Sequence, residues 1–275
     1  MGPALTDLIA ARFDEETATR GDSAFLRQML TRRSIRAFAD RPVPDALVRT
    51  LLAGGLSAPS KSDLQQVSVI WLRDPAQREA LTALVPQFPW LRTAPVLLVF
   101  CGDGRRIRSL AAARARPFAN DHLDSFMNAA VDAGIALASS LYVAESLGLG
   151  GCPISEIRNR IDEVSTLLAL PAQVFPLAAL CLGWPAEDPP LRQRLPTAVT
   201  LHQDRYDDSD LLAAVERYDA ARAAAAPVEP EQQRDPARWG RADLYGWSED
   251  RCRQYAVPAR RDWGAYIRRQ GFDLS

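Results

Sequence analysis

The longest apolar segment of the chain, residues 126–147, limits the folds that this sequence can adopt. It is rich in alanine and glycine, and its length approaches that of a membrane-spanning helix. Asn128, Asp132 and Glu145 interrupt it, and such residues are rare within a membrane, so we reject a membrane span. Because small side chains allow another helix to approach closely, the segment predicts a helix in a protein core or at a subunit interface.

The regular elements expected around this helix favour an α+β fold. Apolar runs with β-forming residues predict strands at 67–72, 94–101, 175–184 and, more briefly, 198–202. Helical spacing predicts helices at 23–30, with Ser23 as cap, and at 45–56, 75–84, 155–168 and 209–226. The glycines at 148–151 follow a helix and lack the spacing of a dinucleotide-binding fingerprint, so we expect a helix cap and turn there. Strands and helices do not alternate regularly, which disfavours a doubly wound sheet.

Composition narrows the function classes. The 275 residues carry a formal net charge of -1 and are 47% hydrophobic, which is enough for a sizeable core but gives no basic excess for nucleic-acid binding. The four cysteines are widely spaced and there are two histidines, so no metal site is expected. The first residues lack the apolar core of a secretory signal, and we expect a cytoplasmic protein without a membrane anchor.

Residues 31–38, Thr-Arg-Arg-Ser-Ile-Arg-Ala-Phe, place three arginines and a serine within five positions. A guanidinium offers a planar fork of donors that matches phosphate oxygens. A serine at a helix end adds a hydroxyl group and exposed backbone N–H groups. The cluster suits a dianionic phosphate, although taken alone a solvated basic helix end explains it better.

Four segments together resemble the FMN-dependent nitroreductase family, specifically its branch of NADPH flavin oxidoreductases and oxygen-insensitive NADPH nitroreductases. They are RRSIRAF at 32–38, APSKSDLQ at 58–65, AESLGLGGCPISEIRN at 144–159 and LCLGWPAEDPPLRQRLP at 180–196. The end of the chain, WGAYIRRQGF at 263–272, is also similar. The resemblance covers about residues 23–275. It implies a nitroreductase-like fold, in which helices flank an antiparallel central sheet and two chains interlock in a homodimer with FMN at the interface.

The resemblance also implies the cofactor site. The phosphate and ribityl chain of FMN are assigned to Arg32, Arg33, Ser34 and Arg36, with Arg192 and Arg194 closing on the phosphate. The loop that approaches the flavin ring from the partner chain is matched by Ser60, Lys61, Ser62 and Leu64. Gln87 matches a glutamine that hydrogen-bonds the ring, and the segment beside the ring is matched by Pro153, Ile154, Ser155 and Glu156. No catalytic acid or base is expected.

The implied activity is that of an NADPH-dependent FMN oxidoreductase, which reduces nitroaromatics, quinones or flavins by ping-pong hydride transfer. NADPH is the hydride donor and a small aromatic molecule the acceptor. The 2′-phosphate of NADPH is assigned to Arg234, Arg238 and Arg241, in a polar segment, 227–243, that a solvated linker explains equally well. We expect residues 1–22 to form an N-terminal extension, 23–203 the FMN-binding domain, and 204–275 a helical arm of that domain that docks on the partner chain.

One departure from the family pattern leaves alternatives open. Ser155-Glu156 stands where the family usually has two glycines that let backbone N–H groups approach the flavin. Glu156 is either a solvent-facing residue at a helix start or a carboxylate beside the ring that repels reduced flavin. The change motivates a second hypothesis, a flavin-binding protein with little turnover that acts as a sensor or carrier. A third is a family offshoot with a dedicated catabolic substrate.

Overall fold

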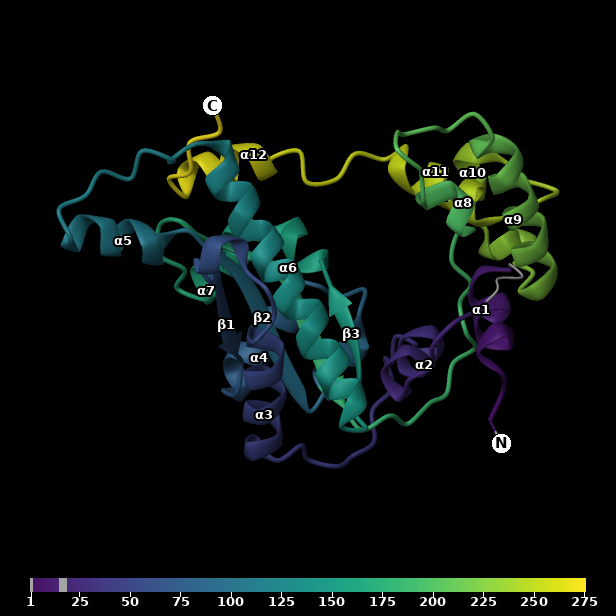
Figure 1. The fold of residues 1–275 in the computed structure, drawn as a ribbon, viewed down its shortest axis with the longest axis horizontal. Helices are drawn as coiled ribbons and strands as arrows, with labels where there is room; N and C mark the ends of the chain where they lie inside the picture. Colours follow the sequence, from purple (N-terminus) through teal and green to yellow (C-terminus); the bar gives the residue numbers. More distant parts are fainter. Residues whose placement is uncertain (1, 15–18) are drawn as a thin grey trace. The chain divides into compact units, whose positions relative to one another are not determined.

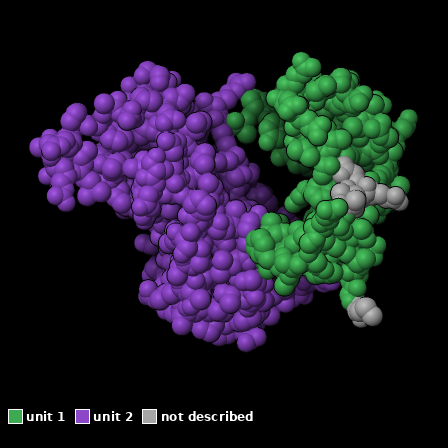
Figure 2. Space-filling view, viewed as in Figure 1, with its two compact units in different colours: residues 1–32, 190–259 green, residues 33–189, 260–275 purple. Residues whose placement is uncertain are grey.

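The computed structural model describes residues 2–14 and 19–275, which form two compact units (Figure 2). Unit 1 comprises residues 1–32 and 190–259, and unit 2 comprises residues 33–189 and 260–275. The chain passes from one unit to the other three times. Each unit is therefore assembled from segments that are far apart in the sequence.

Unit 2 contains a four-stranded antiparallel sheet. The strands are β1 (Val67–Trp71), β2 (Val96–Asp103), β3 (Gly150–Ile154) and β4 (Val174–Gly183), in the order β1-β2-β4-β3. The α+β class and the antiparallel sheet are thus confirmed.

The identity of one strand differs from expectation. Residues 197–200 form the short helix α8 (Thr197–Thr200), so the strand expected at 198–202 is wrong, and the fourth strand begins instead at Gly150. Glycine is a poor strand former, but close packing requires it here. A Cβ atom at Gly150 would lie 2.5 Å from Ile35, and one at Gly151 would lie 2.5 Å from Leu182.

Helices cover both faces of the sheet (Figure 1). One face packs against α3 (Asp45–Leu56) and α6 (Leu123–Ser146), and the other against α4 (Pro75–Ala83), η3 (Glu156–Arg160) and α7 (Ile161–Leu167). By length and composition α6 could cross a membrane, but its alanine-rich side lies against β2, β4 and α3. One side of α6 is therefore part of the core of unit 2.

The other elements of unit 2 are short. They are η1 (Lys61–Asp63), η2 (Pro89–Thr93), α5 (Arg105–Ala113) and α12 (Trp263–Arg269). Tyr266 and Phe272 from the end of the chain join the buried cluster around Phe175. The last residues of the chain are therefore part of the core of unit 2.

Unit 1 is helical. Its elements are α1 (Leu5–Phe13), α2 (Ala24–Thr31), α8, α9 (Leu211–Ala225), η4 (Pro230–Gln232), α10 (Pro236–Trp239) and α11 (Trp247–Tyr255). Leu5, Leu8 and Leu30 join α1 to α2, and the Ser23 hydroxyl caps α2 by accepting the Leu26 N–H at 3.1 Å, as expected. The segment at 227–243 is more structured than the linker that its composition suggested. Within it the buried Gln233 exchanges two hydrogen bonds with the backbone of Ala242.

Candidate functional site

The first arginine segment enters unit 2 beside the sheet. The Ile35 N–H donates to the Gly151 carbonyl at 3.1 Å, which places residues 33–36 along β3. The Glu187 carboxylate accepts the backbone N–H groups of Arg36 (2.6 Å) and Ala37 (3.0 Å), and these two bonds hold the pKa of Glu187 below its usual value. Arg33 is paired with Asp188 at 3.4 Å. The segment is fixed through its backbone, and the Arg36 side chain is exposed.

The expectation that a helix end supplies free N–H groups at Ser34 is wrong. Helix α2 ends at Thr31, and a helix C-terminus exposes carbonyl groups, whereas only an N-terminus exposes N–H groups. The N–H groups of residues 35–37 are bonded within unit 2. Phosphate binding here therefore depends on side chains.

A buried carboxylate of α6 holds the loop that contains Ser60, Lys61, Ser62 and Leu64. Asp132 of α6 is 2% exposed, and its two oxygens accept the N–H groups of Lys61 and Gln66, each at 3.0 Å. In the sequence alone, Asp132 is marked only as a charge that argues against a membrane span.

The backbone of this loop is strained. Ser62, Asp63 and Gln65 have φ values of 51°, 56° and 51°, a region that residues other than glycine rarely adopt. Such conformations persist only where the surroundings enforce them, and they cluster at functional sites. The two bonds from Asp132 provide that enforcement at both ends of the loop.

The segment from Pro153 to Glu156 links the end of β3 to η3. Pro153 is exposed, and Ile154 is buried within the core. Ser155 precedes η3 and Glu156 begins it, so Glu156 starts a short 3₁₀ turn. The Glu156 carboxylate lies 3.3 Å from the Arg260 guanidinium and accepts the Asn159 side-chain N–H at 2.6 Å. Its charge is therefore partnered within unit 2.

In unit 1 the other three phosphate-binding candidates are tied together. Arg32 follows α2, while Arg192 and Arg194 lie in the extended stretch before α8. Arg12 of α1 donates to the carbonyls of Arg32 (2.7 Å) and Arg192 (2.8 Å), and its own carbonyl accepts the Arg194 N–H at 2.7 Å. Sequence reasoning assigned no role to Arg12, because nothing in its local sequence marks it.

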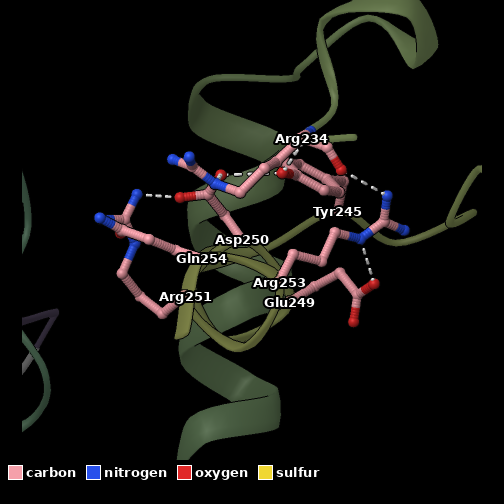
Figure 3. Close-up of polar contacts among 7 residues, drawn as sticks. All are labelled: Arg234, Tyr245, Glu249, Asp250, Arg251, Arg253 and Gln254. Carbon is pink, nitrogen blue, oxygen red and sulfur yellow. Dashed lines mark hydrogen bonds and ion pairs between the residues drawn. The ribbon is translucent and has the colours of Figure 1, made fainter. Parts of the chain in front are cut away.

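The three arginines assigned to NADPH do not share one contact set. Arg234 lies 3.3 Å from Asp250, which also accepts the Tyr245 hydroxyl at 2.8 Å (Figure 3). Arg241 pairs with Glu231 at 3.0 Å on the surface, and Arg238 lies over the Trp239 ring. The structure thus gives each of them a separate local partner.

A different group of arginines lines a cavity of about 240 Å³ in unit 1. Arg192, Arg222 and Arg251 face it together with Tyr245, Trp247 and Asp250. Burial, and next the charges of Arg234 and Arg222, lower the pKa of Arg251. Several cations therefore surround few carboxylates, which is an environment that favours a bound anion. Arg222 and Arg251 were missed because they lie on two different helices.

Gln87 lies exposed in the turn after α4.

Three of the cysteines, Cys101, Cys152 and Cys181, are buried as small core residues, and burial raises the pKa of Cys101 to about 12. These thiols have the character of inert packing groups.

Most of the chain matches known proteins. Residues 29–184 match the model of the "Nitroreductase family", and residues 192–275 match "Nitroreductase family, C-terminal domain". An oxygen-insensitive NADPH nitroreductase of Salmonella typhimurium is 41% identical over 189 residues, 68% of this chain and 76% of that protein. An FMN reductase [NAD(P)H] of Bacillus subtilis is 37% identical over 198 residues, 70% of this chain and 79% of that protein.

The fold has solved counterparts. The structure of NfrA2 from B. megaterium superimposes with a TM-score of 0.83 at 32% identity, covering 92% of this chain and 100% of that one. Residues 1–28, which include α1 and Arg12, lie outside the family match.

Proposed function

The chain belongs to the nitroreductase family, and on that premise we propose that it is an NADPH-dependent flavin oxidoreductase that uses FMN to reduce nitroaromatics, quinones or flavins. The observation that carries the proposal is that the matched part of the chain contains the loop Ser60–Gln66, whose backbone is fixed by Asp132. A strained polar loop, fixed through its backbone by a buried carboxylate, is suited to holding a ring system in one place.

The residues present fit FMN. Arg36, Arg192 and Arg194 are exposed guanidinium donors on segments whose backbones are hydrogen-bonded, so their side chains are available for the phosphate. Arg32, Arg33 and Ser34 complete that set, and Ser60, Lys61, Ser62, Leu64, Gln87 and the segment Pro153–Glu156 are assigned to the flavin. Bound FMN supplies the hydride chemistry, and the protein supplies binding, orientation and tuning. Neither a catalytic acid nor a catalytic base is assigned.

Anaerobic mixing of the flavin-loaded protein with NADPH tests this function. A reductase should lose its yellow absorbance rapidly and recover it when a nitroaromatic or quinone is added. The competing function, a flavin-binding sensor or carrier, is favoured by Ser155-Glu156 in place of two glycines. Slow bleaching that does not depend on NADPH concentration would support that alternative.

We assign the family's homodimer to this chain as well, and a stripe on α6 supports it. Leu123, Met127 and Val131 recur every four residues on one side of the helix, and each is about half exposed. Large exposed apolar residues in one row are typical of an interface. A Met127→Arg, Val131→Arg double variant should become monomeric by light scattering and lose FMN. A monomeric, active wild-type protein would contradict the assignment.

The cytoplasm remains the expected location of the protein.

The NADPH phosphate is assigned to unit 1, where two arginine groups compete. Replacing Arg234, Arg238 and Arg241 together should raise the KM for NADPH far more than that for NADH if they meet the 2′-phosphate. The cavity arginines Arg222 and Arg251 offer the alternative, since they converge on one space. A second variant replaces Arg222 and Arg251 together. Only the variant that removes the contacts with the 2′-phosphate should change the ratio of the KM for NADPH to the KM for NADH.

A further inference from the structure

We propose that Arg12, in the segment that precedes the family match, is a positioning residue of the FMN phosphate site. It acts by fixing the backbones of Arg32, Arg192 and Arg194. The inference rests on the proposed function, because it assumes that these three side chains bind the phosphate. It gives the N-terminal helix α1 a specific task in cofactor binding.

The Arg12 side chain is built into unit 1. It is 4% exposed, and its guanidinium donates to three backbone carbonyls: Leu30 at 2.8 Å, Arg32 at 2.7 Å and Arg192 at 2.8 Å. Two of these carbonyls belong to the C-terminal end of α2, where carbonyl groups lack helical partners and the helix dipole favours a cation. The third lies 160 residues further along the chain than Arg32. One rigid fork therefore joins two distant segments.

The main chain of Arg12 adds a fourth connection, because its carbonyl accepts the Arg194 N–H at 2.7 Å. The residues on either side of Gln193 are thus both bonded to Arg12, and the Gln193 carbonyl accepts the Tyr218 hydroxyl at 3.2 Å. A stretch without regular secondary structure is held at three successive residues. Ordering it in advance removes an entropy cost that phosphate binding would otherwise carry.

The position and the charge of Arg12 fit a role in ordering the two arginine segments better than a role that only anchors α1 to α2. The apolar contacts of Leu5 and Leu8 with Leu30 already join α1 to α2. A buried guanidinium needs hydrogen-bond acceptors for its N–H groups. Arg12 donates to carbonyls in the two segments that carry phosphate-binding candidates. Contact with Arg32 and Arg192 from one side chain fixes their spacing.

The test compares FMN with riboflavin, which lacks the phosphate. Dissociation constants of both flavins are measured for the flavin-free, full-length protein by fluorescence quenching. Wild type should prefer FMN strongly. Arg12→Ala should reduce that preference about ten-fold, by weakening FMN binding and leaving riboflavin binding nearly unchanged. Arg12→Lys keeps the charge but cannot span three carbonyls, so it should fold and still lose several-fold of the preference.

Arg253→Ala is the matched control. Arg253 is also 4% exposed in unit 1 and donates to two backbone carbonyls, those of Arg234 and Gly240, and to the Glu249 carboxylate. Figure 3 shows its contacts with Arg234 and Glu249. Arg253→Ala should lower stability like Arg12→Ala but leave the FMN-to-riboflavin ratio within about two-fold of wild type.

Three results would overturn the proposal in distinguishable ways. Equal binding of both flavins by wild type would remove the phosphate site itself, and with it the proposed function. A normal preference in wild type that survives in Arg12→Lys and Arg12→Ala would reject only the role of Arg12. An equal loss of the FMN preference in Arg253→Ala would show that both variants act through a general loosening of unit 1.

Discussion

Two polar regions are fixed by buried side chains of opposite charge: the loop Ser60–Gln66 in unit 2, which contains the short 3₁₀ helix η1, and the stretch Arg192–Arg194 in unit 1, which has no regular secondary structure. Asp132 holds the loop by accepting two backbone N–H groups, whereas Arg12 donates to carbonyls in and near its stretch. Both charged side chains are almost fully buried. In each case the backbone is ordered by a residue from a helix. The loop side chains also bond to one another, since the Ser60 hydroxyl accepts the Gln65 N–H and the Lys61 ammonium donates to Ser62 Oγ, whereas the Arg192 and Arg194 side chains are exposed.

The sign of the buried charge follows from the backbone groups it meets. The loop turns its N–H groups towards α6, so a carboxylate is required, and α2 ends in carbonyls, so a guanidinium is required. The number of side-chain hydrogen bonds also differs: Asp132 accepts two, from the two ends of one loop, and Arg12 donates three, to two segments that are distant in the sequence. We therefore expect loss of Asp132 to damage unit 2 locally, and loss of Arg12 to act on the spacing of phosphate donors.

The largest effect is expected from Asp132→Ala. It leaves the Lys61 and Gln66 N–H groups without their acceptor, and hydrogen bonds to charged groups contribute about 1.5–3 kcal/mol each. We expect a loss of about 3 kcal/mol in the free energy of unfolding by urea, together with loss of turnover. Asp132→Asn keeps one acceptor oxygen and should lose about half as much.

Ser140→Ala is the control for that variant. Ser140 lies on the same helix and is fully buried, and its hydroxyl has no hydrogen-bond partner among the described residues. Its replacement should change stability and turnover little. If Asp132→Ala were equally mild, the loop would not depend on the carboxylate.

The second prediction concerns Arg36, one of the residues proposed to bind the FMN phosphate. Its backbone is held by Glu187 and its side chain is exposed. Arg36→Ala removes a charge-assisted contact and should weaken FMN binding about ten-fold or more, without loss of stability. Arg49→Ala, at an exposed position of α3, should leave the dissociation constant unchanged. A fully yellow Arg36→Ala protein after dialysis would reject the phosphate assignment.

The sequence could predict most of the elements and could nominate candidate ligand-binding side chains, because both depend on local pattern. The Ser23 cap, helix 45–56 and the arginine cluster are of this kind. It could not predict the roles of Asp132, Arg12 and Glu187, whose hydrogen-bonded partners lie up to 180 residues away along the chain. The strand at Gly150–Ile154 was missed for a similar reason, since close contact with Ile35 and Leu182 outweighs low strand propensity.

A third prediction uses Glu156 and Arg260, a charge pair in unit 2 that could tune the flavin. If both lie beside the ring, Glu156→Gly should raise the FMN midpoint potential and widen the range of accepted nitroaromatics, and Arg260→Gln should lower that potential. A double variant, Glu156→Gln with Arg260→Gln, should return close to wild type. Spectroelectrochemical titration measures all three.

Glu163→Gln provides the comparison, because Glu163 pairs with Arg160 at 2.6 Å in the neighbouring helix. It should leave the potential unchanged. Shifts of equal size in Glu163→Gln, or an unchanged potential in Glu156→Gly with only a small stability loss, would make Glu156 a residue of the helix start alone.

The smallest effect is expected at Glu187, which holds N–H groups as Asp132 does but is exposed to solvent. Its pKa in the folded protein is lowered from 4.5 by the N–H groups of Arg36 and Ala37. A lowered folded-state pKa stabilises the protein above the unfolded value and loses that contribution as the pH falls through the folded value. The stability difference between wild type and Glu187→Gln should therefore be present at neutral pH and vanish well below pH 4.5.

FMN retention gives the same comparison a site-specific readout. Below pH 4.5 wild type should release FMN more readily, and Glu187→Gln should already do so at neutral pH, because the backbone that carries Arg36 is then less ordered. Glu79→Gln is the control, since Arg92 lowers the pKa of Glu79 in the same direction but Glu79 lies far along the chain from this segment. Its stability should show the same sign of pH dependence, with FMN retention unchanged. A Glu187→Gln protein whose FMN retention follows the wild-type pH profile would show that the arginine segment is ordered without this carboxylate.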